Sequence, residues 1–150
     1  MNLNAKDYFF VGIQLILFVL YIFDIFIFEI HFPEIINGFS AGIAVLGVVV
    51  FVLALLQLNK NLSPFPSPKS NSELIQTGLY KYIRHPIYTG ILLTVFGYGF
   101  YTNSFFKIII SLLILILFYF KSSYEEERLS NKFFDYKKYM KSTGRFLPKI

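Results

Sequence analysis

Two long runs of apolar residues near the amino terminus constrain this chain most strongly. The first covers residues 8–28 and contains one charged residue, Asp24, and the second covers residues 35–58 and contains none. A helix needs about 20 consecutive apolar residues to cross a hydrocarbon core about 30 Å thick. Both runs meet this requirement, so the sequence predicts an integral membrane protein.

Two shorter apolar runs, residues 87–101 and 105–120, follow closely on one another and predict a helical hairpin. We therefore expect one all-α membrane domain over residues 1–150, with four transmembrane helices and no Rossmann domain. The composition agrees, because 55% of the residues are hydrophobic and 15% are charged, against about 45–50% apolar and about 25% charged in soluble domains. The chain has no cysteine, which excludes disulfides and thiolate metal sites, and no metal site is expected.

The positions of the basic residues predict the orientation in the membrane. The connection between the first two runs has no Lys or Arg, whereas the connection of residues 59–86 and the tail after residue 120 contain most of them. Cytoplasmic loops carry an excess of Lys and Arg, so both termini and the functional face are expected in the cytoplasm. The net charge of +5 follows from this topology, and no nucleic-acid partner is expected.

Two segments are predicted to lie outside the membrane core. Residues 59–72 are rich in Asn and Ser, and Pro64, Pro66 and Pro68 alternate within them, which predicts an extended, polyproline-like loop. In the tail, apolar residues recur at helical spacing with lysines mainly off that face. This pattern predicts an amphipathic helix over residues 122–141 at the membrane interface.

Glycine pairs mark two places of close helix packing. Gly38 and Gly42 lie four residues apart, which favours a close approach of helices, either inside the bundle or in a homodimer. Gly97 and Gly99 are also interpreted as close helix packing, since they follow no strand and lack the third glycine of a dinucleotide loop. Asp24 lies near the outer end of the first run and is interpreted as structural, although an acid at membrane depth is a functional candidate.

The stretch that leads into the third run has the strongest functional pattern. Pro86 suits the first turn of a helix, which places Arg84 and His85 at a helix N-terminus, where free N–H groups attract anions. Three tyrosines surround this position, and their rings could contact a flat base or a cation: Tyr80, Tyr82 and Tyr88. A basic, aromatic membrane anchor is the competing interpretation, and it does not explain the His-Pro pair.

A second candidate lies just after the fourth run. Glu125 shares a helical face with Leu129 and Phe133, and Lys121 precedes it by one turn. The predicted hairpin brings this position to the same membrane face as His85. A cationic, aromatic corner that faces a carboxylate suggests a zwitterionic ligand with a flat ring.

The paired motifs resemble a known family. The segment RHPIYTG of residues 84–90 is preceded by TGLYKYI and followed about 35 residues later by EEERLSNKFFDYKKY and then by RFLP. This arrangement resembles the isoprenylcysteine carboxyl methyltransferase family, and the phospholipid N-methyltransferases look similar. The resemblance covers roughly residues 64–148 and extends to the first two runs only through hydropathy.

The resemblance implies a membrane enzyme that transfers a methyl group from S-adenosylmethionine to a lipophilic acceptor, such as a prenylcysteine carboxylate or another lipid headgroup. Arg84 and Lys121 are implied as catalytic residues that orient the headgroup. Lys121 stands where the family has an arginine, which keeps the charge but loses bidentate recognition. The residues implied in cofactor binding are Leu74, Ile75, Tyr80, His85, Pro86, Ile87, Tyr88, Glu125 and Glu126.

Two alternatives stay open from the sequence. A related fold in sterol reductases has a similar Arg-x-Pro-x-Tyr region and uses NADPH, so a membrane reductase is one alternative. The other is a non-enzymatic membrane scaffold that uses the face of Gly38 and Gly42 and the basic tail to bind partners or anionic lipid. The methyl acceptor, whether carboxylate, amine or hydroxyl, is not determined by the sequence.

Overall fold

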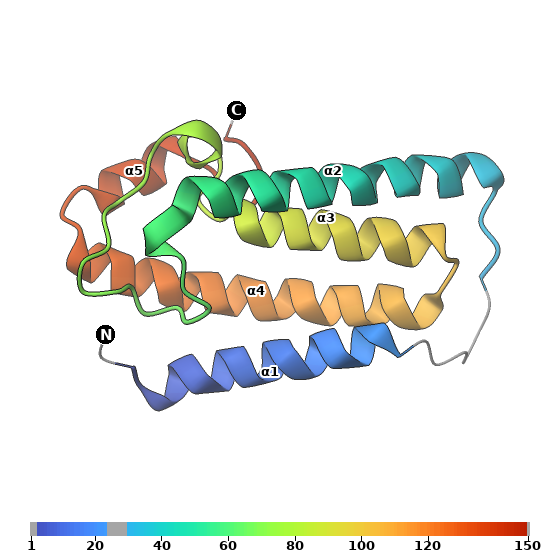
Figure 1. Ribbon diagram of the computed structural model, residues 1–150, viewed down its shortest axis with the longest axis horizontal. Helices are drawn as coiled ribbons and strands as arrows, with labels where there is room; N and C mark the ends of the chain where they lie inside the picture. Colours follow the sequence, from blue (N-terminus) through green and yellow to red (C-terminus); the bar gives the residue numbers. More distant parts are fainter. Residues whose placement is uncertain (1–2, 24–29, 150) are drawn as a thin grey trace.

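The computed structural model describes residues 3–23 and 30–149, and Asp24 lies outside these ranges. The four long helices are α1 (Ala5–Ile22), α2 (Glu34–Leu58), α3 (Pro86–Tyr101) and α4 (Phe105–Lys132). They lie side by side, and α5 (Tyr136–Ser142) sits at one end of the bundle beside the loop between α2 and α3 (Figure 1). That loop contains two short 3-10 helices, η1 (Asn59–Asn61) and η2 (Gly78–Lys81). The described residues form no strand, so the predicted all-helical class is confirmed.

Three of the described helices are long and apolar enough to cross a membrane: α1, α2 continued through η1, and α4. The chain is therefore an integral membrane protein. The fourth predicted span, α3, has 16 residues, which corresponds to about 24 Å at 1.5 Å per residue. It packs between α2 and α4 (Figure 1), and Asn103 turns the chain into α4 with a φ of 53°.

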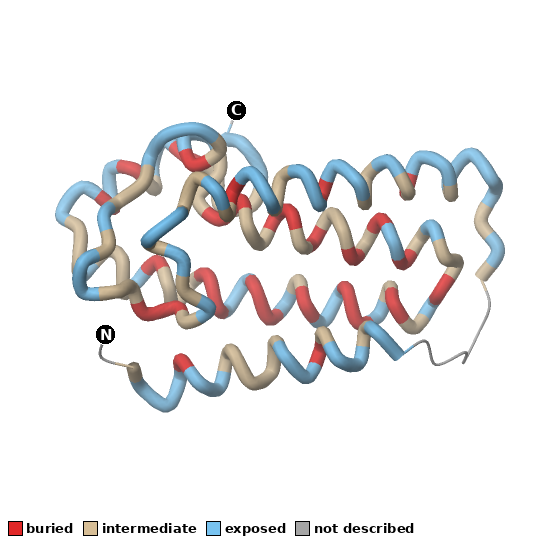
Figure 2. Tube along the Cα trace, viewed as in Figure 1, coloured by how far each residue is buried: buried red, intermediate tan, exposed pale blue. Residues whose placement is uncertain are grey.

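The outer faces of the helices are apolar, as expected for a protein that is surrounded by lipid. Large apolar side chains such as Ile16, Phe39 and Leu56 are exposed on α1 and α2, whereas most of the buried positions lie on α3 and α4 (Figure 2). The core between α3, α4 and α1 includes Ile114 and Phe118, which are both fully buried. An apolar exterior is stable here because lipid tails do not penalise exposed hydrocarbon.

Glycines bring α2 and α3 into close contact. A Cβ at Gly47 would lie 2.5 Å from the backbone nitrogen of Thr94, and one at Gly97 would lie 2.5 Å from that of Ala44. The close packing predicted at Gly97 is therefore confirmed. In contrast, no atom of the described residues lies within 4 Å of a Cβ at Gly38 or Gly42, so the expectation that this pair packs inside the bundle is wrong. The homodimer at this pair stays a prediction.

The predicted interfacial helix over residues 122–141 is not one helix. The chain continues from the apolar part of α4 through Lys132 without a break, because residues 121–132 contain neither glycine nor proline. The helix ends at Phe133, and α5 begins only at Tyr136. Glu125 and Leu129 thus belong to α4 itself, and they lie in its C-terminal part at the end of the bundle.

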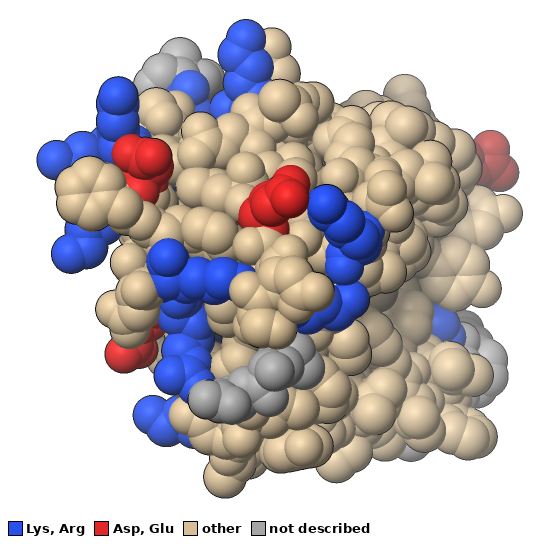
Figure 3. Space-filling view, turned by 60° about the vertical axis from the view of Figure 1, so that its left-hand side comes forward, with Lys and Arg blue, Asp and Glu red and all other residues tan. Residues whose placement is uncertain are grey.

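Basic side chains gather at this end of the bundle, as the space-filling view shows (Figure 3). Of the fourteen Lys and Arg residues, only Lys107 lies elsewhere, near the start of α4. The others lie in the first turn of α1, in the loop between α2 and α3, in the C-terminal half of α4 or after it. The molecule therefore has one strongly basic end and a predominantly apolar body.

The glycine contacts predict opposite effects of one substitution at two positions of α2. Gly47→Ala should lower the free energy of unfolding by about 1–3 kcal/mol because its Cβ clashes with α3. Gly42→Ala should leave it unchanged or raise it by up to about 1 kcal/mol, because alanine favours helix. Unfolding of both variants in detergent, followed by circular dichroism, measures the difference. Equal effects at the two positions would contradict the packing described.

Candidate active site

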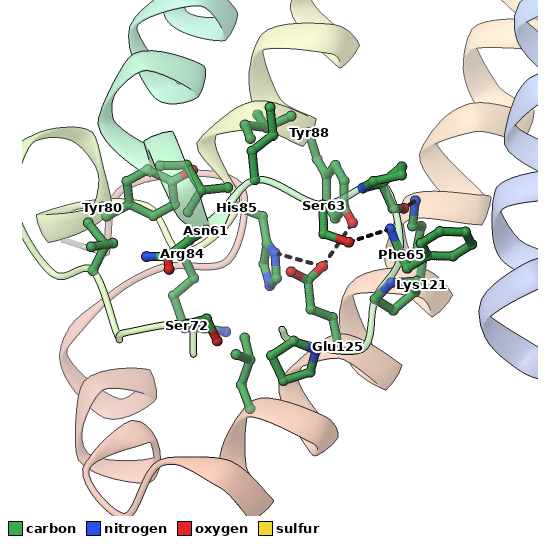
Figure 4. Close-up of a pocket in the computed structure, with 18 of the residues that line it drawn as sticks. Asn61, Ser63, Phe65, Ser72, Tyr80, Arg84, His85, Tyr88, Lys121 and Glu125 are labelled. Atoms are coloured by element: carbon green, nitrogen blue, oxygen red, sulfur yellow. Dashed lines mark hydrogen bonds and ion pairs between the residues drawn. The ribbon is translucent and has the colours of Figure 1, made fainter. Parts of the chain in front are cut away.

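A cavity of about 370 Å³ lies at the basic end of the bundle (Figure 4). All five α-helices and the loop between α2 and α3 contribute to its wall. Nine of the residues that the sequence singled out line it: Leu74, Ile75, Tyr80, Arg84, His85, Ile87, Tyr88, Lys121 and Glu125. Pro86 and Glu126 do not line it; Pro86 forms the first turn of α3. The volume falls within the range of about 300–1,000 Å³ that is typical of ligand pockets.

The C-terminal segment holds the start of α3 in place. The backbone N–H of Arg84 donates to the carbonyl of Gly144 over 2.8 Å, and that of His85 donates to the carbonyl of Arg145 over 3.1 Å. The hydroxyl of Thr89 also donates to the carbonyl of Phe146 over 2.7 Å. Pro86 at the first position of α3 has no N–H to satisfy. His85 is thus fixed by its backbone before its side chain makes any contact.

Glu126 is the centre of a buried ionic network. Its Oε1 accepts a hydrogen bond from Arg84 Nε at 2.8 Å and lies 3.1 Å from His85 Nε2. Its Oε2 accepts a hydrogen bond from Arg145 Nη2 at 2.6 Å. The side chain of Glu126 is only 3% exposed. Glu126 therefore joins the start of α3, α4 and the C-terminal segment, and acts as a positioning residue behind the cavity wall.

The guanidinium group of Arg84 is buried and makes hydrogen bonds within the protein. Besides Glu126, it donates from Nη1 to the carbonyl of Met140 over 3.2 Å and to the carbonyl of Thr143. Its side chain is 8% exposed. Arg84 lines the cavity, but these contacts make it a residue that positions α5 and the C-terminal segment.

Glu125 faces the cavity directly. Its Oε2 accepts a hydrogen bond from the Tyr88 hydroxyl at 2.8 Å and lies 3.8 Å from His85 Nδ1 (Figure 4). Its Oε1 has no hydrogen-bond donor among the described residues, and 26% of the side chain is exposed. A carboxylate with one oxygen held and the other free is suited to accept hydrogen bonds from a ligand's ammonium or hydroxyl groups.

Aromatic side chains form much of the wall around Glu125. The Tyr88 ring stacks on the His85 ring with centroids 5.4 Å apart and on the Phe118 ring at 4.5 Å. Burial, followed by the nearby charges of Glu125 and Tyr139, raises the pKa of the Tyr80 phenol. Tyr80 is consequently a neutral hydrogen-bond donor at physiological pH, and its hydroxyl lies 3.4 Å from the carbonyl of Ala54.

The proline-rich loop covers one side of the cavity. Pro64, Pro66 and Pro68 all line it, so the predicted extended loop forms part of the site, although residues 59–61 form η1. Asp7 of α1 holds the loop, because its carboxylate accepts hydrogen bonds from the N–H and the hydroxyl of Ser67, both at 2.9 Å. Asp7 is fully buried.

Lys121 lies between this loop and α1 and is 1% exposed. Its Nζ donates to Gln14 Oε1 over 2.5 Å and to the carbonyl of Pro64 over 3.0 Å. It also lies 5.6 Å from the centre of the Tyr88 ring. In Figure 4, Lys121 lies on the α1 side of the cavity, and Tyr80 and Arg84 lie on the opposite side.

Several lining residues were not predicted from the sequence. Phe18 and Phe51 come from α1 and α2, and Tyr139 comes from α5. Gln14 offered a signal, since it is the one amide or charged residue between Tyr8 and Ile22. Tyr136, the first residue of α5, also lines the cavity. Nothing in the sequence indicated that the two phenylalanines meet at one cavity.

Comparisons with known proteins agree with this all-helical membrane fold. The family model of the phospholipid methyltransferases matches residues 35–137, so the chain belongs to that family. The matched range contains both motifs that line the cavity, and it does not contain α1.

A solved structure has a similar fold. It is the eukaryotic intramembrane Ras methyltransferase, an isoprenylcysteine carboxyl methyltransferase, without a monobody. The TM-score is 0.61 at 18% identity, and the match covers the whole of this chain but 55% of that one. This chain thus spans about half the length of the similar protein. No curated protein sequence matches it. The resemblance to this group of membrane methyltransferases, expected from the motifs, is confirmed.

Two adjacent glutamates test the ionic network. Glu126→Ala should lower the free energy of unfolding by about 3–5 kcal/mol, because it leaves the buried Arg84 guanidinium without its carboxylate. Glu127→Ala, at an exposed position, should change it by less than about 0.5 kcal/mol. Thermal unfolding of both variants in the same detergent gives the comparison. A Glu126→Ala protein as stable as Glu127→Ala would contradict the network.

Proposed function

We propose that this protein is an S-adenosylmethionine-dependent methyltransferase that acts on a lipophilic acceptor at the cytoplasmic face of the membrane. The observation that carries the proposal is Glu125, a carboxylate on the cavity wall with one oxygen held by Tyr88 and the other free. Membership of the phospholipid methyltransferase family supports methyl transfer. The gathering of basic residues at the cavity end supports a cytoplasmic site, termini on that face and a fourth crossing by α3.

The residues present fit S-adenosylmethionine. Its ammonium and ribose hydroxyl groups are hydrogen-bond donors, which the free Oε1 of Glu125 can accept. The rings of Tyr80 and Tyr88 both line the cavity and suit an adenine ring or a sulfonium cation. Leu74 and Ile75 add apolar surface from the loop. When bound, the cofactor supplies a methyl group activated by a positively charged sulfur.

The chain's own residues hold one another in a fixed orientation around the cavity. Glu126 fixes the His85 ring through Nε2, which leaves Nδ1 directed toward Glu125, and Tyr88 holds Glu125 from the other side. Methyl transfer needs an in-line approach and little covalent help from the protein, so orientation of this kind is its main contribution. Well-oriented reacting groups can lower the activation free energy by about 7–11 kcal/mol in favourable systems.

Apolar residues of three helices in the cavity wall suit an apolar acceptor. Phe18 of α1, Phe51 of α2 and Ile91 of α3 line it, and these helices present apolar surfaces to the surrounding lipid. We infer that an acyl or prenyl chain lies against these three residues and that its headgroup reaches Lys121 and Glu125. In this arrangement Lys121 orients the headgroup, and Arg84 contributes by positioning the C-terminal segment.

Calorimetric titration of the detergent-purified protein with S-adenosylhomocysteine and with NADPH tests the proposal. We expect the adenosyl ligand to bind and NADPH not to bind. Glu125→Gln should weaken binding at least about tenfold, since it removes a charge-assisted hydrogen bond. Glu127→Gln, an exposed neighbour, should bind as the wild type does. Binding of NADPH alone, or adenosyl binding that is unchanged in Glu125→Gln, would contradict the proposed site.

A further inference from the structure

Within the described part of the chain, Lys121 makes hydrogen bonds only to neutral groups, and the proposed function does not explain this. Lys121 is a buried ammonium group, and no carboxylate oxygen of the described residues lies within ion-pair distance of its Nζ. Its two hydrogen-bond acceptors, Gln14 Oε1 and the Pro64 carbonyl, are both neutral. A buried charge with only neutral hydrogen-bond partners is costly, so an anionic ligand beside Lys121 would be favoured.

Gln14 is the second unusual residue at this position. It is the one amide or charged residue of α1 after the first turn, which carries Lys6 and Asp7, and it lines the cavity together with Lys121. Its amide oxygen faces the ammonium at 2.5 Å, since the amide nitrogen would repel a cation. The amide nitrogen then carries two N–H groups that have no acceptor among the described residues.

We propose that Gln14 and Lys121 together form a two-donor clamp for the anionic group of the lipid acceptor, a carboxylate or a phosphate, and that Gln14 thereby determines the preference for anionic over neutral lipids. This inference rests on the proposed function and names the substrate class of the same site. A lone lysine is a point charge, whereas an anion with two or more oxygens is best recognised by two donors side by side. The amide of Gln14 supplies the second donor, and its oxygen holds the first in place.

The location of the clamp agrees with this role. Lys121 lies one helical turn before Glu125 on α4, so the clamp adjoins the carboxylate proposed to bind the cofactor. Phe18, one turn after Gln14 on α1, lines the cavity as well. An anionic headgroup at the clamp would therefore have its apolar chain beside Phe18 and its reactive end near Glu125.

The test uses three probes with the same farnesyl chain: N-acetyl-S-farnesylcysteine, which has a carboxylate, its neutral carboxamide, and farnesyl phosphate. Their dissociation constants are measured with detergent-solubilised wild-type protein in the presence of S-adenosylhomocysteine. We expect at least one anionic probe to bind about tenfold or more tightly than the neutral one. Tighter binding of the carboxylate or of the phosphate probe identifies which anion the clamp prefers.

Gln14→Glu places a carboxylate beside Lys121 without changing the shape of the side chain, and Gln14→Met removes the amide. Both variants should lose the preference for the anionic probe and bind the neutral carboxamide within about twofold of the wild type. Gln76→Glu adds the same charge at an exposed loop position and should keep the preference. Binding of S-adenosylhomocysteine by every variant verifies that the fold and the cofactor site persist.

The outcomes separate this inference from the proposed function. A wild type that binds S-adenosylhomocysteine but shows no preference for an anionic probe overturns the clamp and leaves the methyltransferase proposal standing. Equal weakening of anionic and neutral probes in the Gln14 variants also overturns it, because Gln14 would then only shape the cavity. Failure of the wild type to bind S-adenosylhomocysteine at all contradicts the proposed function itself.

Discussion

The buried carboxylate of Glu126 is the interaction on which the rest of the site depends. It holds Arg84 and His85, at the start of α3, together with Arg145 of the C-terminal segment, two segments far apart in the sequence. Without it, both arginines would lose the carboxylate that they share. The carboxylate thus allows the C-terminal segment to pack against the start of α3, and it leaves Glu125, the preceding residue on α4, free for a ligand.

The membrane explains why the polar groups are concentrated at one end. Apolar helices need no polar surface in lipid, so α1, α2 and the apolar part of α4 expose many large hydrocarbon side chains. Charged and hydrogen-bonding groups are costly there and collect where the helices end and the loop and tail fold over them. A cavity at this boundary is lined by both polar and apolar residues. That combination is what an enzyme needs to join a polar cofactor with a lipid acceptor.

Much of this arrangement could be predicted from the sequence, for identifiable reasons. Hydropathy located the four long helices, because each contains a continuous apolar run, and three of these runs are long enough to cross a membrane. The His-Pro pair and the Glu125 motif pointed to one site, since a hairpin returns both to the same face. The sequence could not show that Glu126 points away from the cavity, or that Gln14 reaches Lys121. Those facts depend on how α1 and the C-terminal segment pack, and no local pattern encodes that packing.

Photochemical labelling tests the central claim, that this cavity holds the cofactor. The purified protein is irradiated with radiolabelled S-adenosylmethionine, and the labelled peptides are then mapped. The account predicts label within residues 72–91 and 121–139, and protection by excess unlabelled S-adenosylhomocysteine. Label confined to other parts of the chain, or label that the competitor does not reduce, would contradict it.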